Sequence, residues 1–138
     1  MAANRANFET PGDHMVPPEI ISKEPLGPLV RHGDNNWGDI VRWTLNALIT
    51  AEELGVTTAN MSEMAAGTNN PEINRLLGTE GNLGDMLGID AEWAHRAIMV
   101  CGTYGEVLAN NIGAATIIGL ARGLNSKWTD GGLIISPP

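Results

Sequence analysis

The chain has 138 residues, of which 43% are hydrophobic and 17% charged, a composition that fits one globular domain and excludes a disordered polypeptide. Its formal net charge of −8 disfavours nucleic acid and anionic membrane surfaces as partners, and no apolar run approaches the roughly 18 residues of a membrane span. One cysteine excludes an internal disulfide, no Cys or His spacing matches a structural zinc site, and we expect no bound metal or cofactor.

Residues 1–36 are predicted to form an extended, proline-rich ribbon. Five of the eight prolines lie there, at positions 11, 17, 18, 25 and 28. Proline fixes φ and removes a hydrogen-bond donor, so no long helix is expected, and residues 15–16, 20–21 and 29–30 are at most short β-like pieces. We therefore divide the chain into this segment and a helical domain over residues 37–138.

Three helices are predicted in the first half of that domain. Residues 37–54 carry apolar side chains at steps of three and four, after Asp34, Asn35 or Asn36 as cap and before Gly55. A shorter helix is expected to begin at Thr57 or Thr58 and to stop at Gly67. The run Asn70-Pro71-Glu72 indicates the start of a third, which ends at Gly78.

The second half of the domain is predicted to hold three more helical segments. A brief helix is expected over residues 83–87, and Asp90 is expected to cap a long helix that runs to Gly113. Gly102 and Gly105 weaken that helix, which suggests that another backbone packs close to it. A last short helix is expected over 117–124, before a turn at 130–132 and an extended tail. The fold class is thus mainly α, with about five to six helices after the ribbon.

The search for catalytic motifs gives little. The nearest set is Ser22 with His14 and His32, which lie near Asp13 and Asp34 and could form a Ser/His/acid group only if the fold brings them together. His95 has Glu92 three residues before it, which favours an ordinary helix-surface pair over a general base.

Two other residue types have both a structural and a functional interpretation. Cys101 falls on the apolar stripe of the predicted long helix, which favours a buried, inert thiol over a nucleophile. The four tryptophans, Trp37, Trp43, Trp93 and Trp128, are expected to pack in or against the core, with stacking on a ligand as the alternative.

Five separated motifs carry a resemblance to a known family. They are "PEIISKEPLGPLVRHGDNNWGDIVRWTLNALITAEELGVT", "NPEINRLLG", "LGIDAEWAHRAI", "YGEV" and "ARGLNSKWTDGGL". In this order they resemble the C-terminal part of the periplasmic amino-acid-binding proteins of ABC importers, most closely the general L-amino-acid, or glutamate/glutamine/aspartate/asparagine, type. The resemblance runs from about residue 7 to residue 138.

The resemblance implies part of a type II periplasmic-binding-protein lobe, of α/β architecture, with the ribbon as a hinge strand between two lobes. Most of the family's ligand contacts come from earlier chain, and the candidates for ligand contact here are Lys23, Glu24, Arg31 and Trp37. The family is periplasmic. The first residues lack the regions of a secretory signal, so the chain as written is expected in the cytoplasm.

Two functions are therefore expected as alternatives. The first is a truncated amino-acid-binding protein, without an expected enzymatic activity, that binds polar L-amino acids weakly or not at all and meets an ABC permease only in a full-length context. Helices without their sheet expose apolar faces, so self-association is expected as well. The second is a small hydrolase of an ester, lactone or amide, with Ser, His and acidic groups assembled by a new fold or an oligomer interface.

Overall fold

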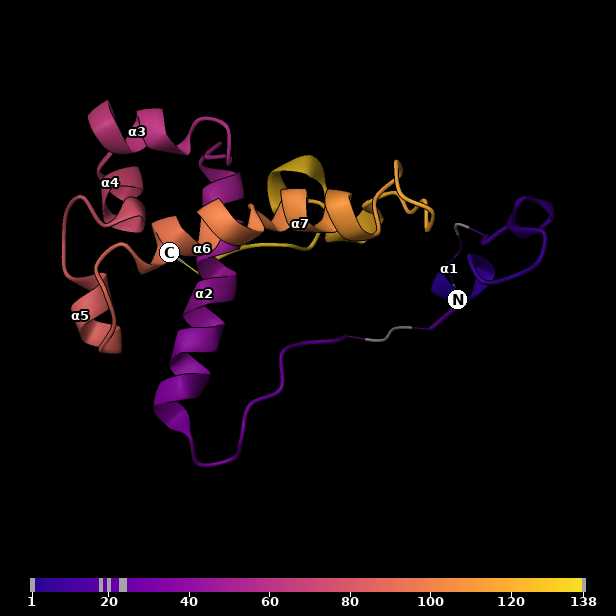
Figure 1. Cartoon of the computed structure of the whole chain (residues 1–138), viewed down its shortest axis with the longest axis horizontal. Helices are drawn as coiled ribbons and strands as arrows, with labels where there is room; N and C mark the ends of the chain where they lie inside the picture. Colours follow the sequence, from indigo (N-terminus) through magenta and orange to yellow (C-terminus); the bar gives the residue numbers. More distant parts are fainter. Residues whose placement is uncertain (1, 18, 20, 23–24, 138) are drawn as a thin grey trace.

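The fold is a set of short helices arranged around one long helix, as Figure 1 shows. The computed structural model describes residues 2–17, 19, 21–22 and 25–137. In these residues the α-helices are α1 (Ala2–Arg5), α2 (Asn35–Glu53), α3 (Met61–Gly67), α4 (Pro71–Leu77), α5 (Leu83–Leu87), α6 (Trp93–Cys101) and α7 (Tyr104–Asn111), and the 3-10 helices are η1 (Pro11–Asp13), η2 (Gly123–Asn125) and η3 (Trp128–Asp130). Six α-helices follow the ribbon and the described residues form no strand, so the predicted mainly α fold is confirmed.

The long helix α2 begins and ends close to the predicted positions. Asp34 is its cap, and the Asp34 Oδ1 atom accepts a hydrogen bond from the Trp37 backbone N–H at 3.2 Å. The helix stops at Glu53, two residues before Gly55, which has a left-handed φ of 71°. It contacts α4, α5, α6 and α7, and so forms the centre of the helical part.

The start of α4 is as predicted, whereas that of α3 is not. The Asn70 side chain accepts a hydrogen bond from the Glu72 N–H at 2.9 Å, with proline in the first turn. The α3 helix begins at Met61 after Asn60, later than the expected caps. The Asn60 side chain accepts from the Thr57 N–H at 2.7 Å, which holds residues 57–60 in a turn and delays the helix.

The predicted long helix from Asp90 is in fact two helices, α6 and α7. Gly102 separates them with φ 86° and ψ 176°, a conformation that no helix contains and that side chains with a Cβ rarely adopt. Thr103 and Glu106 then start α7 with a capping box, in which each side chain accepts from the other's backbone N–H at 3.3 and 2.8 Å. The T-x-x-E signature was present in the sequence and decides this break.

The prediction of a helix over residues 117–124 is wrong. Turns and bends occupy residues 114–118, and the next helical segment is the 3-10 helix η2. Gly119 has a left-handed φ of 67°, and the Leu120 N–H donates to the Ile112 carbonyl at 3.0 Å, so the chain doubles back instead of winding. The turn near Gly131, with φ 81°, and the extended tail after it are confirmed.

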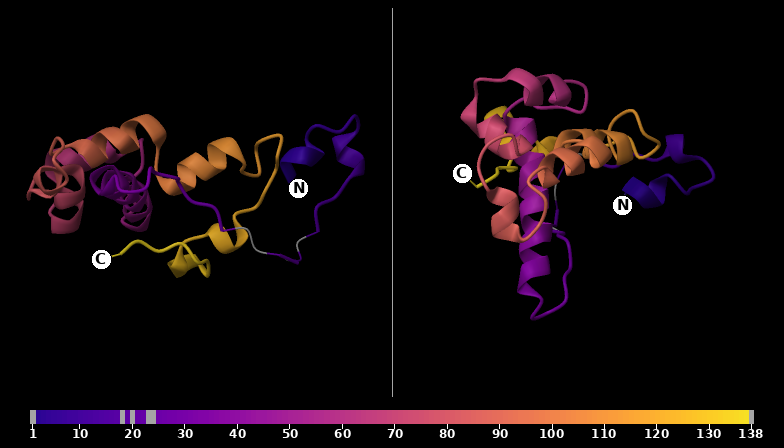
Figure 2. Two further views of the ribbon diagram at one scale, coloured as in Figure 1. Left: turned by 90° about the horizontal axis from the view of Figure 1, so that it is seen from below. Right: turned by 60° about the vertical axis from the view of Figure 1, so that its left-hand side comes forward.

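The N-terminal segment lies at the end of the molecule opposite α3, α4 and α5 (Figures 1 and 2). The Arg5 guanidinium donates to the His14 carbonyl at 3.2 Å and to the Ile118 carbonyl at 3.4 Å, which links this segment to the loop after α7. No long helix forms here, as predicted. Residues 15–16 and 29–30 pair with no strand, and Ile20, in the third expected β-like piece, lies outside the described residues.

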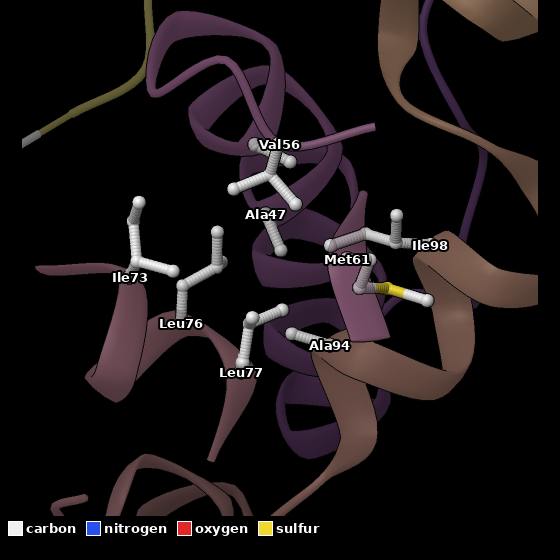
Figure 3. Close-up of a cluster of buried hydrophobic side chains, with 9 residues drawn as sticks. Ala47, Val56, Met61, Ile73, Leu76, Leu77, Ala94 and Ile98 are labelled. Atoms are coloured by element: carbon white, nitrogen blue, oxygen red, sulfur yellow. The ribbon is translucent and has the colours of Figure 1, made fainter. Parts of the chain in front are cut away.

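The hydrophobic core lies where α2, α3, α4 and α6 meet, and Figure 3 shows its side chains pointing toward one another. Its buried members are Ala47, Ala51, Val56, Met61, Ile73, Leu76, Leu77, Ala94 and Ile98. Alanines on α2 and α6 let these two helices approach closely, while the larger side chains of α3 and α4 fill the space beside them.

The chain exposes much more surface than its mass predicts. A compact monomer of 14.6 kDa is expected to expose about 6,900 Å², whereas this chain exposes 9585 Å². The surplus of about 2,700 Å² includes large apolar side chains that are almost fully exposed, among them Met15, Ile21, Leu26 and Leu29. No helix among the described residues is long and apolar enough to cross a membrane.

Candidate functional site

A groove of about 520 Å³ lies between α2, α4, the start of α6 and the C-terminal tail. One face of α2 supplies Trp43 and Thr50, since residues at steps of three and four share a face. Trp93 comes from the start of α6 and Trp128 from η3. Side chains from four segments far apart in the sequence therefore line one groove.

The tail closes one wall of this groove through hydrogen bonds to α2. The hydroxyls of Thr50 and Ser136 lie 2.6 Å apart, and the Ser136 N–H donates to Glu53 Oε1 at 3.1 Å. Residues 135–137 are thereby held along the helix, with Ile135 and Pro137 against the groove. The tail thus forms one wall of the groove.

Aromatic and aliphatic side chains dominate the groove, and its charged groups are few. Trp37 is 53% exposed, Trp43 41% and Trp128 57%, so the prediction that the tryptophans pack in or against the core is wrong for these three, and only Trp93 packs against the core cluster. Glu72 and Arg75 of α4 are exposed, while Glu53 is half-buried. Such a groove suits an apolar or amphipathic segment that stacks on indole rings better than a small, highly charged molecule.

The structure does not bring together the four candidate catalytic residues of the hydrolase alternative. Ser22, His14 and His32 are exposed, and His95 is half-buried on α6. The His14 ring packs edge-on against Phe8 with 4.8 Å between ring centroids, and the segment that carries it lies far from α6 (Figure 1). Within the described residues no hydrogen bond joins these four side chains, and the hydrolase alternative stays a prediction.

The predicted surface pair of His95 with Glu92 is replaced by another. Arg96 Nη2 lies 3.6 Å from Glu92 Oε2 and 3.2 Å from Asp90 Oδ1, because its longer side chain reaches both carboxylates. Cys101 is exposed, not buried as predicted, since α6 ends there and the apolar stripe does not continue across Gly102. No group of described residues is placed to hold a metal ion.

The two candidate ligand contacts that the structure describes are not part of the groove. Arg31 and Trp37 are exposed and lie before or in the first turn of α2, and neither lines the groove. Lys23 and Glu24 lie outside the described residues. The sequence contained Trp43, Trp93 and Trp128, but nothing in their spacing indicated that they would share a surface.

Outside the groove, a polar cluster around Arg122 joins α2, α7 and the loop before η2. The Arg122 guanidinium forms a two-point ion pair with the Glu52 carboxylate and also donates to the Asn125 carbonyl at 2.8 Å. The hydrogen bonds that Arg122 donates to the Glu52 carboxylate raise the pKa of Arg122 above its ordinary value. A Cβ on Gly105 would lie 2.7 Å from Glu52 Oε1, so side chains, and not the predicted backbone, approach this glycine.

Another polar cluster, around Glu106, joins α7 to the loop after α2. Glu106 accepts hydrogen bonds from the Thr103 N–H at 2.8 Å and from the Thr58 hydroxyl at 2.7 Å. Burial alone would raise the pKa of Glu106, but the hydrogen bonds from Thr103 and Thr58 outweigh it and lower the pKa. These contacts stabilise the fold and leave the groove as the candidate site.

The architecture is that of part of a periplasmic binding protein. A solved ABC transporter periplasmic binding protein from Brucella ovis, with glutathione bound, matches 99% of this chain with a TM-score of 0.93 and 47% identity. The match covers 43% of that protein's chain. The helices therefore have the same arrangement as they have in a longer binding protein.

The curated relatives that the chain matches are amino-acid-binding proteins. The chain is 61% identical, over all of its length, to the glutamate/glutamine/aspartate/asparagine-binding protein BztA of Rhodobacter capsulatus, and 48% identical over 97% of its length to the general L-amino acid-binding periplasmic protein AapJ of Rhizobium johnstonii. It covers 41% and 40% of these relatives. No protein-family model matches the chain.

The chain is homologous to the C-terminal two fifths of glutamate/glutamine/aspartate/asparagine-binding proteins of ABC transporters. This confirms the resemblance carried by the five motifs.

Proposed function

We propose that this chain serves as the C-terminal portion of an amino-acid-binding protein of an ABC importer, and that on its own it binds polar L-amino acids weakly or not at all. The observation that supports the ligand class is the 61% identity, over the whole chain, to a relative named for glutamate, glutamine, aspartate and asparagine. In a full-length context we place it in the periplasm, where the complete protein would meet an ABC permease.

The geometry of the groove supports weak binding by the isolated chain. An amino acid needs paired partners for its carboxylate and its ammonium group, held away from water so that screening is low. In the groove Glu72 and Arg75 are exposed, and Glu53 is already hydrogen-bonded to Ser136. Apart from Asn46 and from Thr50 and Ser136, whose hydroxyls are bonded to each other, the remaining walls are apolar and offer little to a small zwitterion.

Calorimetric titration of the chain with glutamate, glutamine, aspartate and asparagine tests this proposal. We expect no saturable heat at ligand concentrations below roughly 1 mM, which corresponds to a binding free energy weaker than about −4 kcal/mol. The matched control is the same titration after mixing the chain with the N-terminal three fifths of a relative, where binding is expected to appear. Tight binding by the chain alone would contradict the proposal.

We also propose that the chain associates with itself. The surplus surface of about 2,700 Å² is more than the roughly 800 Å² per partner of a standard stable interface, and large apolar side chains are among the exposed groups. Light scattering over a range of protein concentrations is expected to give a molar mass above that of one chain. A constant monomer mass up to the highest concentration would contradict it.

A further inference from the structure

Residues 122–136, which we call the clasp, fold back on themselves through their own backbone. The Leu133 N–H donates to the Leu124 carbonyl at 2.8 Å. The Ile134 N–H donates to the Ser126 carbonyl at 3.1 Å. These two hydrogen bonds bring the start and the end of the segment side by side, so the clasp is a closed loop.

A close backbone contact limits motion inside the clasp. A Cβ on Gly132 would overlap the Ser126 carbonyl group and lie 2.7 Å from the Ser126 Cα, so the two backbones approach to a distance that only glycine allows. The Gly132 N–H also donates to the Lys127 carbonyl at 2.9 Å. The two halves of the clasp therefore cannot shift against each other without losing both contacts.

The clasp is attached to the end of α2 at two points. At its start, the Arg122 guanidinium forms the two-point ion pair with Glu52. At its end, the Ser136 N–H donates to Glu53 Oε1 at 3.1 Å, and the Ser136 hydroxyl lies 2.6 Å from that of Thr50. In Figure 1 the yellow segment passes α2 on its way to the C-terminus. Both attachments therefore lie within one turn of the same helix.

Hydrogen bonds connect the two attachments through the clasp. The Arg122 guanidinium donates to the Asn125 carbonyl from Nε at 3.2 Å and from Nη2 at 2.8 Å. Asn125 precedes Ser126, and the Ser126 carbonyl accepts from the Ile134 N–H. Ile134 in turn lies two residues before Ser136. A continuous path of contacts therefore runs from the ion pair to the second attachment.

We propose that the clasp opens and closes as one unit, and that this motion makes and removes one wall of the groove. Trp128, Ile135 and Ser136 are the clasp residues that line the groove, whereas Arg122 does not line it. Opening as a unit requires both attachments to break, so loss of either one eases the release of the whole clasp. Arg122 is then a positioning residue, which holds the groove wall from a place outside the groove.

Residue-resolved amide hydrogen exchange of the whole chain tests this proposal. Arg122→Ala is expected to speed exchange about tenfold at the Ser126 N–H, because hydrogen bonds between charged groups are among the strong ones. The same factor is expected at the Ile134 and Ser136 N–H groups, near the other attachment. Ser136→Ala is expected to act in the reverse direction, with equal factors at Ile134 and Ser126. Faster exchange at Ser126 alone in Arg122→Ala would overturn the proposal.

Two further variants separate clasp opening from a general loss of stability. Ile73→Val removes a methyl group from the buried core and does not change the clasp, so its clasp amides are expected to exchange as in the parent. Acceleration equal to that in Arg122→Ala would show that these amides exchange only when the whole chain unfolds, and would also overturn the proposal. Arg122→Lys keeps the charge but not the two-point pair. It is expected to speed exchange at both ends of the clasp by one common, smaller factor, and unequal factors would contradict motion as a unit.

Discussion

Arg122 and Glu52 lie 70 residues apart in the sequence and form a two-point ion pair that joins the loop before η2 to α2. The second of the two contacts, between Arg122 Nη2 and Glu52 Oε2, measures 3.2 Å. The guanidinium carbon also lies 5.8 Å from the centroid of the Tyr104 ring on α7. One side chain therefore fastens α7 and the loop before η2, which contribute no residue to the core cluster, to α2, which does.

Arg122→Ala is expected to lower the free energy of unfolding by about 1 to 3 kcal/mol, because it leaves the half-buried Glu52 carboxylate without its partner. Urea unfolding followed by circular dichroism measures this loss. Arg42→Ala is the control, since Arg42 and Asp39 form an exposed pair at 3.6 Å whose loss is expected to cost less than about 1 kcal/mol. Equal losses in the two variants would contradict the role of the Arg122 pair.

Gly105→Ala is expected to destabilise the parent and to stabilise a chain that lacks the ion pair. A Cβ at residue 105 would lie 2.7 Å from Glu52 Oε1 and 3.0 Å from Arg122 Nη1, so the side chains of the ion pair must shift to admit it. In an Arg122→Ala, Glu52→Ala background the same change should add up to about 1 kcal/mol through helix propensity. The change of sign, measured by urea unfolding, is the diagnostic result.

Gly67→Ala provides the matched control for Gly105. Gly67 lies in the last turn of α3 and a Cβ there would meet no atom within 4 Å. The change is expected to be neutral or stabilising in both backgrounds. A destabilising effect at Gly67 as large as that at Gly105 would show that crowding by the ion pair is not the cause.

Acid is expected to weaken the fold partly through Glu106. Its pKa is lower in the folded chain than the ordinary value of 4.5, so its contribution is fully present above pH 4.5 and is lost as the pH falls through the lower, folded pKa. Glu106→Gln should flatten the dependence of unfolding free energy on pH below 4.5. Glu63→Gln, at an exposed position of α3, is the control, and it should show the same dependence of unfolding free energy on pH as the parent.

Leu77→Ala is expected to cost about 2 to 5 kcal/mol of unfolding free energy, because Leu77 is fully buried between α2, α4 and α6 and its truncation leaves a cavity. A chain with so small a core is expected to lose most of its cooperative thermal transition. Leu133→Ala, which truncates an exposed leucine, should shift the transition little. Similar melting of both variants would indicate that this cluster does not determine stability.

The helices that the sequence predicted well are those whose local signals agree. For α4 the amide cap, the proline in the first turn and the glycine at the end all point to one helix, and Asp34 with Gly55 marks the limits of α2 in the same way. The break at Gly102 was also local, since the capping box of Thr103 and Glu106 lies in the sequence. The apolar periodicity across it concealed that signature.

The sequence alone determined the mainly helical fold and the caps of α2 and α4, because these depend on contacts between residues a few positions apart. It also determined the family likeness, which depends only on the order of residues in the motifs. Tertiary structure alone decided that Trp43, Trp93 and Trp128 share a groove, that Arg122 reaches Glu52, and that Cys101 is exposed. Such pairings depend on how the helices cross and where the tail is fastened. No periodicity along one segment encodes the distance to another.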